Sequence, residues 1–210
     1  PFEESVLDGE QKSTIIEILD TRNTITDLSL INGVSEYRGV LSIESSGDYS
    51  YEPQSIEVEV FLRNVLFARN HSNSGTIYAE NVKVKMENVL MIENTVGMIG
   101  YYCQLDLINS TIAGNNDTGL RVIMYDDNSR LFVQNSIITD LKLIDIYGID
   151  DGIIEIEYSN ISGGYEGIGN IDVDPMFVSS DSTWYLLDEM SPCVDAGSLE
   201  VISNDISNEA

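Results

Sequence analysis

The feature of this sequence that most constrains its fold is an internal repeat, because a repeat of fixed period is compatible with few architectures. Each copy begins with an apolar residue. A polar or small residue follows two positions after it, a second apolar residue five positions after it, and in most copies Asn or Gly eight positions after it. Copies begin at Ile25, Leu62, Met86, Leu107, Val133 and Ile156, with spacings of 37, 24, 21, 26 and 23 residues.

A period near 23 residues with strand-like alternation predicts an all-β chain folded as a parallel β-solenoid of about six coils. The composition agrees, since 26 Ile and 16 Val stand against only 5 Ala, and β-branched side chains favour strands over helices. One coil cannot bury its own inner face, so we expect the coils to stack about 4.8 Å apart.

The repeat also predicts the register between neighbouring coils. The polar residue before the second apolar position is expected at a bend, where equivalent side chains can form a hydrogen-bonded ladder. Matching offsets should place opposite charges side by side, an arrangement that stabilises neighbouring strands. The expected pairs are Glu59 with Lys83, Arg63 with Glu87, and Lys85 with Asp106. The long first interval predicts an external loop over Ser45 to Gln54.

The charge of the chain excludes several classes of partner. Lys and Arg number 10 against 36 Asp and Glu, giving a formal net charge of −26. Such a surface repels phosphate backbones and anionic lipid, so we expect no nucleic-acid binding. No apolar run reaches the roughly 20 residues of a membrane span, so we expect no membrane insertion. No basic residue follows Lys142, and the acidic end is expected to be folded up to about Leu199.

The C-terminal third carries a recognisable set of motifs. They are Ser159-Asn160-Ile161, Gly163-Gly164-Tyr165, Gly169-Asn170-Ile171, Asp174-Pro175-Met176-Phe177-Val178, Tyr185-Leu186 and Ser191-Pro192-Cys193-Val194-Asp195-Ala196-Gly197. This pattern closely resembles the C-terminal coil and cap of secreted right-handed parallel β-helix proteins of the pectin-lyase-like superfamily, of the choice-of-anchor type. The upstream repeats look like coils of the same family, and Leu7-Asp8-Gly9 resembles its early turn.

The resemblance implies a right-handed parallel β-helix in an extracellular or cell-surface protein that is associated with polysaccharides. It also implies one domain over residues 1–199, with the cap near 165–197, as a fragment of a longer protein whose signal peptide and any anchor lie outside this chain. Residues 200–210 are expected to form a flexible C-terminal end. The sequence does not define an oligomeric state.

Two classes of function are open. The first is a non-catalytic scaffold or polysaccharide-binding module of the cell surface. The alternative is a polysaccharide lyase or glycoside hydrolase acting on an acidic polysaccharide, as in enzymes of the superfamily, which combine a base with clustered acids. We find no such motif and assign no catalytic residue. Arg121, Arg130 and Lys142 are candidate bases, and the simpler interpretation pairs them with Asp126 or Asp127.

Tyrosine side chains are the candidate sugar-binding groups, because a solenoid offers an extended face on which their rings can stack against sugars. The candidates are Tyr101, Tyr102, Tyr125 and Tyr147. The alternative is that these rings cap the edges of the coils.

Ca²⁺ is the candidate cofactor, because acidic turns offer the oxygen ligands that it prefers. The candidate ligands are Asp150, Asp151, Asp172 and Asp174, and the alternative is that these acids are solvated or stabilise turns. The two cysteines, Cys103 and Cys193, are expected to be free thiols, and His71 an ordinary surface residue of a turn.

Overall fold

The computed structural model describes residues 5–11, 15–46, 56, 58–123, 128–139, 153–178 and 185–200. Within these residues the chain forms 18 strands and no helix, and the strands build a parallel β-solenoid of about five turns. The all-β solenoid predicted from the repeat is therefore confirmed. The described part contains no helix that is long and apolar enough to cross a membrane.

The strands follow one another along the chain with short connections. They are β1 (Val6–Asp8), β2 (Ile16–Leu19), β3 (Asn23–Ile31), β4 (Val34–Ser35), β5 (Leu41–Glu44), β6 (Glu59–Ala68), β7 (His71–Ser72), β8 (Ile77–Glu80), β9 (Lys83–Glu87), β10 (Leu90–Ile92), β11 (Val96–Tyr101), β12 (Gln104–Ile108), β13 (Thr111–Ala113), β14 (Thr118–Ile123), β15 (Arg130–Gln134), β16 (Ile137–Ile138), β17 (Ile153–Glu157) and β18 (Asn160–Ile161).

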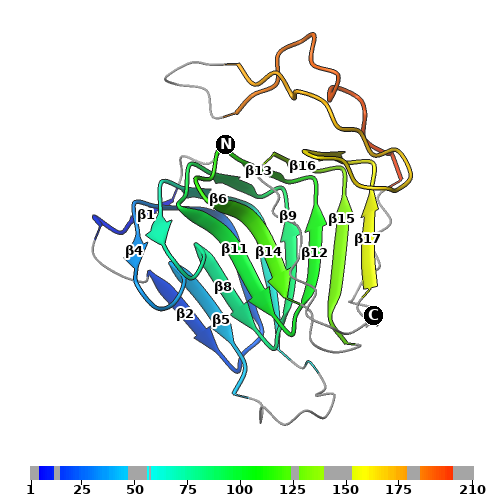
Figure 1. Cartoon of the computed structure of the whole chain (residues 1–210). Helices are drawn as coiled ribbons and strands as arrows, with labels where there is room; N and C mark the ends of the chain where they lie inside the picture. The colour runs from blue at the N-terminus through cyan, green and yellow to red at the C-terminus, as the bar shows by residue number, and fades with distance from the viewer. Residues whose placement is uncertain are drawn as a thin grey trace.

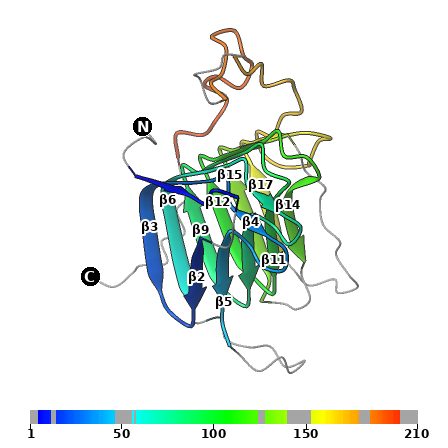
Figure 2. The same cartoon turned by 90° about the vertical axis from the view of Figure 1, so that its left-hand side faces the viewer.

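Two parallel sheets form the walls of the solenoid (Figures 1 and 2). Sheet A has 11 strands and sheet B has five, in the order β14-β11-β8-β5-β2. Sheet A has two parts. Part A1 holds the first half of β6 with β9, β12, β15 and β17, and part A2 holds the second half of β6 with β10, β13, β16 and β18. Strand β3 spans both parts, β1 pairs with its end, and β4 with β7 forms a small third sheet.

A left-handed residue separates A1 from A2 in every coil, at the position where the repeat predicts a bend. These residues are Asp27, Asn64, Asn88, Asn109, Asn135 and Tyr158, with φ between 48° and 55°. Asn and Asp reach this conformation at lower cost than most residues. The Asn88 amide donates to Asn64 over 2.6 Å, and the Asn64 amide donates to Asp27 over 2.8 Å. The predicted ladder at the bend is therefore confirmed over three coils.

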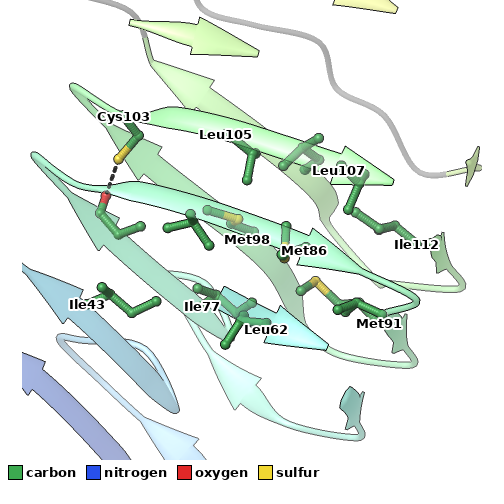
Figure 3. Packing of buried hydrophobic residues seen from close by; sticks show 14 of the residues in the cluster. Ile43, Leu62, Ile77, Met86, Met91, Met98, Cys103, Leu105, Leu107 and Ile112 are labelled. Atoms are coloured by element: carbon green, nitrogen blue, oxygen red, sulfur yellow. Dashed lines mark hydrogen bonds between the residues drawn. The ribbon is translucent and has the colours of Figure 1, made fainter. Parts of the chain in front are cut away.

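The apolar positions of the repeat form two continuous stacks inside the solenoid. The first stack is Ile25, Leu62, Met86, Leu107, Val133 and Ile156, and the second is Leu30, Phe67, Met91, Ile112, Ile138 and Ile161. All but Ile25 are buried. Figure 3 shows Leu62, Met86 and Leu107 of the first stack beside Met91 and Ile112 of the second. Burial of a side chain of this size contributes about 1.5–3 kcal/mol, so the stacks are a main source of stability.

The predicted charge register is also confirmed. Glu59 lies beside Lys83, Arg63 beside Glu87, and Lys85 beside Asp106 on neighbouring strands of A1. Arg63 and Glu87 come within 3.9 Å of each other. The match shows that the repeat also predicts which residues lie side by side on neighbouring strands of A1 at these three positions.

The number of turns differs slightly from the prediction of about six. Sheet A does carry all six copies of the repeat, the last of them in β17 and β18. A complete turn also needs a strand in sheet B, and sheet B has five strands in the described part of the chain. The repeat counts strands of sheet A, so it overestimates the turns by about one.

The C-terminal segment leaves the solenoid and then returns to it (Figures 1 and 2). Phe177 and Leu187 form an antiparallel bridge, and the ring of Phe177 meets that of Tyr185 edge-on at 4.9 Å. Tyr185 packs on a small cluster on the outside of A2, which contains Leu66, Ala68, Leu90 and Ile92. Farther on, the Ser198 amide donates to Asn135 Oδ1 over 2.7 Å, which ties this segment to the bend of the fifth copy.

Candidate functional site

The outer face of sheet B brings aromatic and acidic side chains together. Because successive side chains of a strand point to opposite sides, the residues that alternate with the core residues face outward, although Ser42, Ile99 and Ile123 among them are buried. Two outward columns cross neighbouring strands in register: Ser42, Tyr78, Ile99 and Arg121 form one, and Glu44, Glu80, Tyr101 and Ile123 form the other. We call Ser42, Glu44, Tyr78, Glu80 and Tyr101, with the nearby Glu17 and Arg38, the tyrosine–glutamate surface.

Two tyrosine rings and one carboxylate form the centre of this surface. The ring centroids of Tyr78 and Tyr101 lie 5.8 Å apart with planes inclined by 45°. The Tyr78 hydroxyl donates a hydrogen bond to Glu80 Oε2 over 2.7 Å. Burial, the hydrogen bond to Glu80 and the nearby carboxylates raise the pKa of Tyr78, so its hydroxyl stays protonated and keeps donating. The Glu80 carboxylate is thereby fixed beside both rings.

The carboxylate of Glu44, the second acid in this column, is held by a different set of partners. Ser42 Oγ donates to Glu44 Oε1 over 2.6 Å, and Arg38 Nη1 lies 2.8 Å from the same oxygen. The same Arg38 nitrogen also lies 2.8 Å from Glu17 Oε1. Only 12% of the Glu44 side chain is exposed, so this carboxylate is largely enclosed by its partners. Arg38 thus compensates Glu17 and Glu44, whereas Glu80 forms no ion pair within the described residues.

The structure places two of the four predicted tyrosines. Tyr101 lies on the tyrosine–glutamate surface, and Tyr102 follows it at the turn after β11 with a φ of 51°. Tyr125 and Tyr147 lie outside the described residues. Tyr78 was not among the predicted candidates. The alternation of β8 (IYAE) is the signal that places Tyr78 outward in mid-strand.

The predicted Ca²⁺ ligands that the structure describes take part in turns. Asp172 Oδ1 accepts the amide of Gly163 over 3.2 Å, and Asp174 Oδ1 accepts the amide of Met176 over 2.8 Å. Asp150 and Asp151 lie outside the described residues. In the described part of the chain, no three His, Cys, Asp or Glu side chains are grouped so that they could hold a metal ion.

The candidate bases are also separated from one another. Arg130 on A1 lies 3.9 Å from Asp106 and 3.6 Å from Glu155, and its guanidinium lies over the ring of Phe132 at 5.3 Å. Arg121 lies on the other wall, in sheet B. Lys142 and the proposed partners Asp126 and Asp127 lie outside the described residues. Asp106 and Glu155 are partners that the sequence argument did not identify.

Asp106 is a buried acid on the outer face of A1. Its exposed fraction is 6%, and burial raises its pKa, against the opposing effect of Arg130, Lys83 and Lys85. The arrangement is therefore a packed ion-pair cluster rather than an open base beside a groove.

The remaining candidates agree with the simpler interpretations. His71 is exposed, as expected, but lies in β7 rather than in a turn, and its Nδ1 shares a hydrogen bond with Thr95 Oγ1 over 2.7 Å. Both cysteines are free, as expected; Cys103 is buried and Cys193 is half-buried. Cys103 Sγ donates to the carbonyl of Tyr101 over 3.0 Å, beneath the tyrosine–glutamate surface.

The comparisons with known proteins do not assign this chain to a family. A scan against protein-family models finds no match, and a search of curated proteins finds no relative. The parallel β-solenoid and the side chains on its walls are therefore the basis for any functional conclusion.

Proposed function

We propose that this chain is a non-catalytic, extracellular β-helix scaffold that binds polysaccharide through the tyrosine–glutamate surface. The observation that carries the proposal is the pair of rings of Tyr78 and Tyr101 beside the hydrogen-bonded carboxylate of Glu80. Aromatic rings supply apolar contact area for the faces of sugars, and a fixed carboxylate accepts their hydroxyl groups. The parallel stacking of coils provides an extended surface along which a polymer can lie.

We also propose that the chain is a member of the pectin-lyase-like superfamily with a C-terminal cap of the choice-of-anchor type. Its support is the set of C-terminal motifs together with the parallel solenoid on which they occur. Secretion and attachment to the cell surface are part of the same proposal.

A scaffold role is favoured over a lyase or hydrolase by the state of the charged side chains. A lyase base must be free to remove a proton from the sugar. Arg38 is instead paired with Glu17 and Glu44, and Arg130 contacts Asp106 and Glu155. Arg38 and Arg130 are therefore held in ion pairs with carboxylates of the chain itself.

The binding proposal is tested by titrating soluble glycans into the wild-type chain and into Tyr101→Ala. We expect loss of the ring to weaken binding about tenfold. Phe61→Ala is the matched control, because Phe61 is a half-buried aromatic on the outer face of A1, against Lys85. Equal loss in the two variants, or no binding by the wild type, contradicts the proposal.

The non-catalytic part of the proposal needs a separate assay. Pectate and alginate are incubated with the chain, with and without Ca²⁺, and unsaturated ends are followed by ultraviolet absorbance. We expect no increase above the blank. Product that disappears in Arg121→Met or Arg130→Met would instead establish a lyase.

A further inference from the structure

The tyrosine–glutamate surface has an uneven distribution of charge. Glu17, Glu44 and Glu80 contribute three carboxylates, and Arg38 binds the first two of them. Arg121 is the cation of the outward columns, and it lies two strands from Tyr78, beyond Ile99. Among the described residues, the carboxylate of Glu80, next to both rings, therefore has no cation as an ion-pair partner.

Glu80 also retains hydrogen-bonding capacity. A carboxylate offers about four lone-pair positions, and the Tyr78 hydroxyl occupies one of them. Glu80 is about half-buried and lies directly beside Tyr101 on the neighbouring strand. A ligand that covers the two rings thus brings its substituents to a carboxylate that is oriented by Tyr78 and that accepts from no other side chain among the described residues.

We propose that this surface selects a polysaccharide with free amino groups, such as a polymer of glucosamine, over neutral and uronate polymers. This inference rests on the proposed function and specifies its substrate class. An ammonium group on a sugar stacked over Tyr78 or Tyr101 supplies the cation that Glu80 lacks, in a charge-assisted hydrogen bond. A uronate carboxylate in the same place meets a like charge, on a chain whose net charge is −26.

The preference is measured by calorimetric titration of the whole chain with three oligosaccharides of equal length: glucosamine, N-acetylglucosamine and galacturonate. Acetylation removes the positive charge and keeps the sugar ring, so the first two ligands differ mainly in the ammonium group. We expect the glucosamine oligomer to bind about fivefold more tightly than its acetylated form at low salt. This ratio should fall towards one as sodium chloride screens the ion pair.

The variant that tests the role of Glu80 is Glu80→Gln, because the glutamine oxygen can still accept from Tyr78 and the fold is kept. We expect this variant to lose the preference while retaining the affinity for the acetylated oligomer. Glu157→Gln is the control, since Glu157 is a half-buried glutamate on the outer face of A1. It should retain the preference of the wild type.

The outcomes separate this inference from the proposed function. Equal binding of the first two ligands, or a preference for galacturonate, overturns the selectivity and leaves the polysaccharide-binding proposal in place. Equal loss of preference in Glu157→Gln and Glu80→Gln overturns it too, because the attraction would then follow net charge. Absence of binding by all three ligands counts against both.

Discussion

The side-chain amide of Asn70 donates a hydrogen bond to Oδ1 of Asn94 over 3.0 Å, inside the turn that leads from A2 towards sheet B. Asn94 in turn donates to Oδ1 of Asn115 over 3.0 Å, and the Oδ1 of Asn70 accepts the amide of Gly33 over 2.8 Å. All three side chains are buried, with exposed fractions of 6% or less. This buried ladder satisfies backbone groups that have no water to bind.

Replacement of the central asparagine tests the contribution of the ladder. Asn94→Ala leaves the backbone N–H of Asn70 and the backbone carbonyl of Phe67 without their hydrogen-bond partners in the core. We expect the free energy of unfolding to fall by about 3 kcal/mol, measured by urea denaturation. Asn88→Gly removes a member of the exposed ladder and suits its left-handed backbone, so its effect should stay within about 1 kcal/mol. Equal effects of the two variants would contradict the assignment.

Gly97 in β11 is expected to tolerate no side chain. A Cβ at this position would overlap the carbonyl oxygen of Gly119 on the neighbouring coil, where the two backbones are in close contact. Gly97→Ala should therefore lower the free energy of unfolding by about 1–3 kcal/mol. Gly100→Ala in the same strand is the control, because its Cβ would have ordinary contacts at 3.6 Å or more. The midpoints of thermal unfolding of the two variants are measured and converted to free energies of unfolding. A difference of less than about 0.5 kcal/mol between the variants would disprove the predicted overlap at Gly97.

The buried acid of A1 gives a pH dependence with an unusual sign. Burial raises the pKa of Asp106 in the folded chain, so the folded state holds this proton more tightly than the unfolded state does. Its contribution to stability is therefore largest at acidic pH and is lost as pH rises through the folded pKa. The unfolding free energy of the wild type minus that of Asp106→Asn should fall from about pH 4 to about pH 7, because the asparagine does not titrate. A rise of this signed value with pH would show that the ion pair with Arg130 outweighs burial.

The two thiols should differ in their rate of alkylation. Burial raises the pKa of Cys103 to about 12, and it also raises the pKa of Cys193, which is only half-buried. With iodoacetamide at neutral pH, we expect Cys193 to be modified first and Cys103 only after unfolding. Peptide mass spectrometry over a time course distinguishes the two sites. Equal rates in the native protein would mean that the coil around Cys103 opens readily.

The sequence predicts the stacks of sheet A well because apolar spacing alone determines them. Leu62 and Met86 are neighbours wherever the repeat is kept, and the pair Arg63 and Glu87 follows from the same offset. The partners of Arg130 could not be found in this way. Local acids were the natural candidates, but Asp106 and Glu155 are reached diagonally across neighbouring strands. Such contacts depend on side-chain length and packing, which spacing does not encode.

The tyrosine–glutamate surface was predicted only in part for a related reason. Sheet B contains no position of the repeat, so its register depends on the length of each turn that leads into it. Tyr78 and Tyr101 become diagonal neighbours because β8 and β11 pair with Met98 opposite Ile77, which places Ile99 beside Tyr78 and Tyr101 beside Glu80. The alternation within β8 indicates that Tyr78 faces outward, but only the structure shows which side chain stands beside it.

The two continuous stacks of apolar side chains inside the solenoid have a consequence for how such a protein can change length. Adding or removing a whole coil keeps both stacks continuous, whereas the insertion of one residue within A1 moves the apolar side chains that follow it to the outer face of the sheet. The wall that bears Tyr78 and Tyr101 can therefore lengthen only in steps of about 4.8 Å. Gene duplication by single coils would extend the reach of this surface along a polymer while leaving the chemistry of each existing position intact.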